Sequence, residues 1–137
     1  MRDLILITDD SYRLDDMQNI LKKNITNTPV HRGEKCIWLE FKKEGDFFGE
    51  HVKIIKGSDV ECFYETDELD NFKKTLLSLQ FYYIHFKDIN HVKLVLKFIA
   101  NKDNVFIDND FGLVLPGKEF IKMCEEKPDW DWAYDDF

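Results

Sequence analysis

The residues of this 137-residue chain that could do chemistry are four histidines, three cysteines and several aspartate clusters. Zinc sites usually use His or Cys at i, i+3 or i+4 spacing, or paired cysteines. His31, His51, His85 and His91 never pair at these spacings, and none lies beside a cysteine at ligand spacing. We therefore predict no metal site.

The cysteines also lack the setting of a catalytic nucleophile, which needs an electropositive and partly exposed thiolate. Cys62 lies beside two glutamates and Cys124 precedes two more, so we expect negative charge to raise their thiol pKa values and both thiols to be structural. The odd cysteine count, the lack of a CxxC pair and the lack of a basic segment before an apolar N-terminal stretch predict reduced thiols and a cytoplasmic location. With no catalytic motif found, we expect no enzyme activity and no cofactor.

The stretch DNDFG (108–112) contains the D-F-G letters of protein kinases. The chain has no glycine-rich loop, lysine strand or catalytic-loop motif to accompany it, and no calcium-hand ligand run. We interpret the stretch as a tight turn between two strands, from which Asp108 and Asp110 project.

The net charge of the chain limits the classes of partner that it can bind. The 27 acidic and 19 basic residues give a formal charge of -8, which disfavours direct binding to nucleic acid or anionic lipid and favours a basic partner. The alternative is that the charge simply maintains solubility. No apolar run approaches the roughly 20 residues that span a bilayer, so we expect no membrane role.

Three segments combine acids with aromatic rings: 44–48, 108–111 and the C-terminal segment 128–137. Protein interfaces use aromatic anchors for affinity and charges for steering. The predicted partner-binding residues are Glu44, Asp46, Asp108, Asp110, Asp129, Asp131, Asp135, Asp136, Trp130 and Trp132. In the terminal segment the rings could instead pack on the domain itself. We expect its tryptophans to serve mainly the fold and its aspartates mainly binding.

Periodicity predicts the elements that must position these residues. Strands are predicted at 3–8, 36–43, 51–57, 59–65, 81–87, 104–108 and 112–116, with 51–57 and 59–65 forming a hairpin. Helices are predicted at 11–24 with Ser11 as cap, from Thr66 to Leu79, after an Asp88 cap, and after Pro116, while 27–35 is a loop. The pattern indicates a single α+β domain over 1–137, with a mixed or mostly antiparallel sheet of about seven strands and about four helices.

The stretch NVFIDNDFGLVLPGKEFI (104–121), followed by PDWDW (128–132), resembles the C-terminal part of small acidic immunity proteins from bacterial polymorphic-toxin and contact-dependent inhibition systems. The resemblance covers the last third of the chain. It implies a cytoplasmic protein that binds one cognate toxin domain and blocks its active site without catalysis. Many such toxins are basic nucleases, to which an acidic surface can bind in place of nucleic acid.

Two other classes of function remain open at this point. One is a small ligand-binding regulator or an enzyme whose site is assembled from scattered histidines and acids in a pocket. The other is an adaptor subunit that uses the same acidic face for a different protein.

Overall fold

The structure is a computed structural model and describes residues 2–41, 50–58, 60–110 and 112–132. Its strands are β1 (Arg2–Asp9), β2 (Val30–Arg32), β3 (Cys36–Phe41), β4 (Glu50–Lys56), β5 (Leu79–Phe86), β6 (Phe106–Asp108) and β7 (Val114–Pro116). Its helices are α1 (Leu14–Asn24), α2 (Thr66–Lys73), α3 (Ile89–Ile99) and α4 (Gly117–Glu126), and a short 3-10 helix η1 (Val60–Phe63) precedes α2.

The strands form one sheet in the order β2-β3-β4-β5-β1-β6-β7, and every pairing is antiparallel. Strand β1 lies inside the sheet, where it pairs with β5 from Arg2↔Phe86 to Asp9↔Leu79 and with β6 on its other side. The expected α+β fold is therefore confirmed, and of the two sheet types predicted, the antiparallel one forms.

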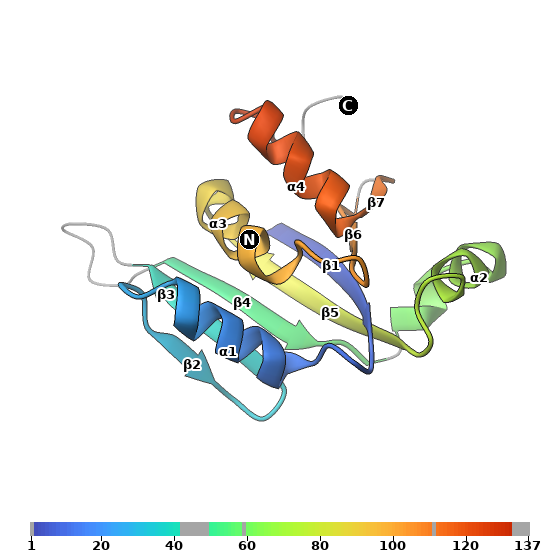
Figure 1. The fold of residues 1–137 in the computed structure, drawn as a ribbon, viewed down its shortest axis with the longest axis horizontal. Helices are drawn as coiled ribbons and strands as arrows, with labels where there is room; N and C mark the ends of the chain where they lie inside the picture. Colours follow the sequence, from blue (N-terminus) through green and yellow to red (C-terminus); the bar gives the residue numbers. More distant parts are fainter. Residues whose placement is uncertain (1, 42–49, 59, 111, 133–137) are drawn as a thin grey trace.

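Helices α1, α3 and α4 lie on one face of the sheet and enclose the main core (Figure 1). Alternation along the strands supplies this core, because Ile37, Leu39 and Phe41 of β3 all point to the helix side. Helix α3 contributes a buried stripe that includes Val92 and Leu96. No helix in the described part of the chain is long and apolar enough to cross a membrane.

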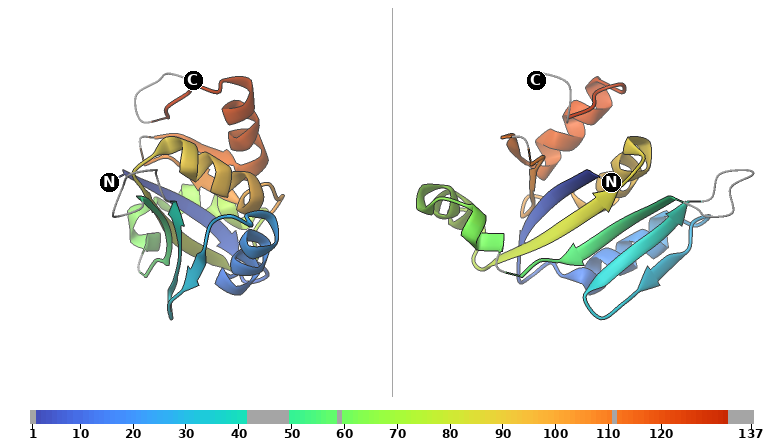
Figure 2. Two further views of the ribbon diagram at one scale, coloured as in Figure 1. Left: turned by 90° about the vertical axis from the view of Figure 1, so that its left-hand side faces the viewer. Right: turned by 180° about the vertical axis from the view of Figure 1, so that it is seen from behind.

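Helix α2 and η1 pack on the opposite face, at one end of the sheet. Ile5 and Ile7 of β1 point away from the main core and form a second cluster with Phe72, Leu76 and Phe81. Figure 1 shows α2 at the far end of the molecule from β2 and β3. Seen from behind, β3 and β4 lie in front of α1, with none of the four helices over them (Figure 2).

Local signals at the helix ends are partly as predicted. Asp88 caps α3, since its carboxylate accepts a 2.8 Å hydrogen bond from the Asn90 N–H. The prediction that Ser11 caps α1 is wrong. Both the backbone N–H and the hydroxyl of Ser11 donate to the carboxylate of Asp9, and the helix begins three residues later, at Leu14.

The predicted hairpin of 51–57 and 59–65 is also wrong, because the chain leaves the sheet after Gly57. The Gly57 N–H donates to the Phe81 carbonyl at 2.8 Å, and the following residues form η1 instead of a strand. Strand β4 pairs with β3 and β5. A short strand β2 forms within the expected loop 27–35, and Leu79 belongs to β5 rather than to α2.

Close approach of α3 and α4 requires a glycine. A Cβ on Gly117 would lie 2.1 Å from the Ala100 carbonyl oxygen, which is far inside van der Waals contact. The Gly117 N–H donates to the Val105 carbonyl at 2.7 Å, so α4 begins directly against the end of α3. This start directs α4 and the residues after it back over the main core (Figure 1).

Candidate protein-binding surface

Negative charge covers the outer side of η1 and α2. The segment 60–72 contains five acids and no lysine or arginine: Glu61, Glu65, Asp67, Glu68 and Asp70. All five are exposed, whereas Phe72 is buried on the inner side of the helix. The Glu68 carboxylate accepts the Glu65 N–H at 3.1 Å, and acids in a first helical turn are favoured by the helix dipole. The helix is therefore stable with its charged side facing water.

Tyr64 joins this segment to β6. Its hydroxyl donates a 2.8 Å hydrogen bond to Asp108, and its ring contacts Phe72 edge-on and stacks on Phe81. Burial raises the pKa of Tyr64, and the hydrogen bond and charge of Asp108 raise it further. The negative charges of Glu68 and Asp110 also raise the pKa of Tyr64.

The β6–β7 connection brings a second group of acids to this point. Asp108 accepts the Asp110 N–H at 2.8 Å, and Asp110 has a left-handed φ of 66°. The Asn109 N–H and the Leu113 carbonyl close the turn at 3.0 Å. Partial burial raises the pKa of the Asp110 carboxyl, and the charges of Asp108 and Asp3 raise it further. Three carboxylates from two strands and a turn thus influence one another.

An apolar groove of about 320 Å³ runs between α2 and strands β6 and β7. Phe72, Phe106, Val114 and Pro116 line it, with Glu68 and Asn71 of α2 beside them. Val114 is the cross-strand neighbour of Asp108, so the acids of the turn lie next to the groove. The arrangement of an apolar centre beside charged groups is typical of protein-binding sites.

Two large apolar side chains are exposed, one before α2 in the chain and one after it. Phe63 is 74% exposed and Leu77 is 97% exposed. Phe63 follows Glu61 and precedes Glu65, so an aromatic ring stands among acids. We call the acidic surface the set formed by Asp3, Glu61, Glu65, Glu68, Asp108 and Asp110 together with Phe63.

The C-terminal tryptophans lie in the main core. Trp130 is 3% exposed and Trp132 is 2% exposed, and both rings pack on Phe120, with centroids 5.3 and 5.1 Å away. Lys93 donates to the Trp130 carbonyl at 2.6 Å, and Asn109 donates to the Trp132 carbonyl at 3.0 Å. The rings are therefore positioned to stabilise the domain, as expected, and neither presents a surface to a partner.

The structure brings together only part of the predicted partner-binding set. Asp108 and Asp110 lie in the acidic surface, whereas Asp129 is exposed and Asp131 half-buried beside the core tryptophans. Glu44, Asp46, Asp135 and Asp136 lie outside the described residues. Sequence reasoning missed Asp3 and the acids of η1 and α2, although the density of acids in ECFYETDELD (61–70) was a signal that could have revealed them.

The histidines are less scattered than the sequence indicates. His31 and His51 flank Glu40 at 3.7 and 3.9 Å, and His85 contacts Asp3, all on the face of the sheet opposite α1. Trp38, His51, Lys53 and His85 line a shallow hollow of about 290 Å³ there. Among the described residues, no group of three or more His, Cys, Asp or Glu could hold a metal ion.

The cysteines differ from one another in their surroundings. Burial raises the pKa of Cys124 to about 11, Lys93 lowers it and Glu125 raises it, which agrees in direction with the sequence expectation. Cys62 is exposed. Its place at the outside of η1 follows from the missing strand at 59–65.

Comparison with protein-family models, curated proteins and solved structures found no match to this chain.

Proposed function

We propose that this chain is a non-enzymatic immunity protein, which binds a cationic toxin domain through the acidic surface and covers the active site of that toxin. The observation that carries the proposal is the apolar groove between α2 and β6–β7 with acids beside it. An apolar side chain of the partner fits the groove, and basic groups around that side chain pair with Glu68, Asp108 and Asp110.

Charge supports a basic partner in two ways. The chain carries a formal charge of -8, which attracts a cationic domain over distances of about a Debye length, roughly 8 Å at physiological ionic strength. Asp3 of β1, Glu68 of α2, and Asp108 and Asp110 at the end of β6 and in the following turn affect the same titrating groups, so the fold concentrates charge that the sequence separates. A nuclease domain that binds phosphate backbones presents the complementary surface.

The proposal includes no catalysis, no cofactor, no direct nucleic-acid binding and a cytoplasmic location, where the toxin acts. It rests on the sequence resemblance of 104–132 together with the geometry around α2. An adaptor that uses the same acidic face would share the groove and the charge, and it differs from an immunity protein in its partner alone.

A protection assay tests the proposal. The toxin domain is taken from the gene beside that of this chain and is expressed in a bacterial host with the wild-type chain, with a Glu61→Gln, Glu65→Gln, Asp110→Asn variant, or with neither. We expect growth only with the wild-type chain, or much faster growth with it than with the variant. Equal killing with and without the wild-type chain would refute the immunity function.

A further inference from the structure

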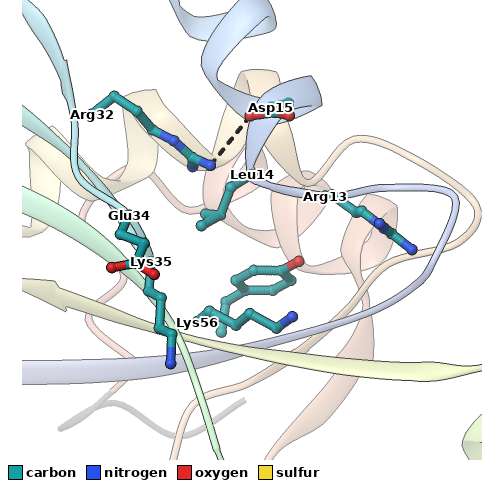
Figure 3. Close-up of a pocket in the computed structure, with 8 residues that line it drawn as sticks. Arg13, Leu14, Asp15, Arg32, Glu34, Lys35 and Lys56 are labelled. Carbon is teal, nitrogen blue, oxygen red and sulfur yellow. Dashed lines mark ion pairs between the residues drawn. The ribbon is translucent and has the colours of Figure 1, made fainter.

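A basic pocket lies where the start of α1 approaches β2 and the end of β4 (Figure 3). It has a volume of about 340 Å³. Its lining residues are Arg13, Leu14, Asp15, Arg32, Glu34, Lys35, Lys56 and Tyr82. Four cationic side chains and two carboxylates thus line the pocket. The net charge of the pocket is positive, whereas the formal charge of the chain is -8.

Arg32 is the most enclosed of the pocket's arginines. Its side chain is 29% exposed, and its Nη2 lies 3.2 Å from the Asp15 carboxylate. The Arg13 Nε donates to the Asp10 carbonyl at 3.1 Å, and its Nη2 makes a longer contact of 3.8 Å with the Asp10 carboxylate, at exposed side chains. A guanidinium has five N–H donors, and a single contact with a carboxylate leaves donors for a second anion.

Lys56 ends β4, and Lys35 directly precedes β3, the neighbouring strand. The Lys56 N–H donates to the Lys35 carbonyl at 2.8 Å, which holds the two backbones together. Within the described residues, no carboxylate oxygen lies within 4.0 Å of the ammonium nitrogen of either lysine, so neither lysine forms an ion pair there. Both ammonium groups therefore keep donors for an anion, and Figure 3 shows the guanidinium groups of Arg32 and Arg13 on opposite sides of Leu14.

Tyr82 of β5 also lines the pocket. Burial raises the pKa of Tyr82, Arg13 and Arg32 lower it, and Asp10 and Asp16 raise it. Both guanidinium charges thus reach the one hydroxyl, which can also donate a hydrogen bond to an anion. A hydroxyl and two guanidinium groups are the donors that protein sites use for phosphate oxygens.

We propose that this pocket binds the diphosphate group of a small phosphorylated ligand. One phosphate contacts Arg32, whose forked donors match two oxygens at once, and the other contacts Lys35 and Lys56, which supply point charges. A volume of about 340 Å³ exceeds what a single phosphate needs and falls at the lower end of small-molecule sites. The inference concerns a surface separate from the acidic one and does not rest on the toxin-binding proposal.

The test is a titration of the full-length chain with pyrophosphate at constant ionic strength, followed by the NMR shifts of its backbone amides. We expect saturable shifts at Arg32, Lys35 and Lys56. A Lys35→Gln, Lys56→Gln variant should bind pyrophosphate about tenfold more weakly or worse, because two charge-assisted contacts are lost. The matched control Lys23→Gln, Lys127→Gln changes the net charge equally at exposed positions outside the pocket and should change the affinity less than about twofold.

Three outcomes would overturn the inference: shifts that never saturate, an equal loss of affinity in the control variant, or binding of succinate as tight as that of pyrophosphate. The last would mean that the pocket selects negative charge rather than phosphate. ADP is titrated in parallel to identify the source of the diphosphate. Tighter binding of ADP supports a nucleotide, and equal binding supports recognition of the diphosphate alone.

Discussion

The Tyr64 hydroxyl donates a 2.8 Å hydrogen bond to the Asp108 carboxylate across 44 positions of chain. The bond links the segment before α2 to β6, and it holds the acids of α2 beside those of the β6–β7 turn. Asp108 also accepts the Asp110 N–H, so one carboxylate orders both parts of the acidic surface. The shape of the proposed binding site therefore depends on a polar contact.

Replacing Tyr64 with Phe tests this contact. The variant keeps the ring packing and loses the hydrogen bond, so we expect the free energy of unfolding to fall by about 0.5 to 1.5 kcal/mol in urea denaturation. Tyr83→Phe is the matched control, because no hydrogen bond of the Tyr83 hydroxyl occurs among the described residues. Equal stability of Tyr64→Phe and wild type would mean that the bond contributes nothing.

Alkaline pH should destabilise the protein through Tyr64 and Tyr12. Burial raises the pKa of both above the ordinary value of 10.0, so the folded state keeps protons that the unfolded chain releases. The contribution of these two protonated hydroxyls to the free energy of unfolding is fully present below pH 10.0 and falls as the pH rises above it. Urea midpoints at about pH 8 and about pH 11 should show the fall, with a smaller one in Tyr64→Phe. An identical fall in that variant would exclude Tyr64 as a cause.

Asp110→Asn should raise stability and weaken partner binding together. At neutral pH the Asp110 carboxylate is repelled by Asp108 and Asp3, and asparagine removes the charge while it still tolerates the left-handed φ. Water screens this exposed group, so the gain stays below about 0.5 kcal/mol. The raised pKa of Asp110 predicts that the gain shrinks as the pH falls toward 3.8, because the folded wild-type carboxyl is then more than half protonated. Urea denaturation at both pH values measures it, and a loss of stability at neutral pH would contradict the repulsion.

Removing either core tryptophan should destabilise the domain strongly. Trp132→Ala empties a site between Phe86 and Phe120, and we expect a loss of about 3 to 5 kcal/mol. Asp129→Asn, at an exposed position near the same rings, should leave the melting temperature nearly unchanged. Thermal melting of both variants decides the point, and a normally melting Trp132→Ala would show that the ring adds little to the fold.

Much of the architecture could be predicted from local patterns, since alternation and helical spacing are written in consecutive residues. The segment 60–65, which was predicted as a strand, shows where local patterns fail. VECFYE (60–65) has the β-branched and aromatic residues of a strand, yet β4 already pairs on both sides, and the close contact at Gly57 directs the chain into η1. Strand β2 has only three residues and forms because β3 offers a free edge, which no local pattern encodes.

The candidate site was predictable only in part for a related reason. Asp108 and Asp110 are separated by a single residue in the chain, and their turn could be identified from NDFG. Asp3 and Glu68 approach that turn only through sheet pairing and the packing of α2 on Ile5 and Phe81, which are long-range contacts. The tail was ambiguous because burial of Trp130 and Trp132 depends on Phe120, a residue of another element.

The most direct test of the account is the association rate between this chain and the proposed cationic toxin partner, measured by stopped flow at two salt concentrations. The wild-type rate should fall as salt rises, and the Glu61→Gln, Glu65→Gln, Asp110→Asn variant should associate about tenfold more slowly at low salt. The matched control is Asp103→Asn, Glu119→Gln, Glu125→Gln, which removes three exposed acids outside the acidic surface and should change the rate less than about twofold. A rate that does not respond to salt, or equal slowing by the two variants, would contradict binding through the acidic surface.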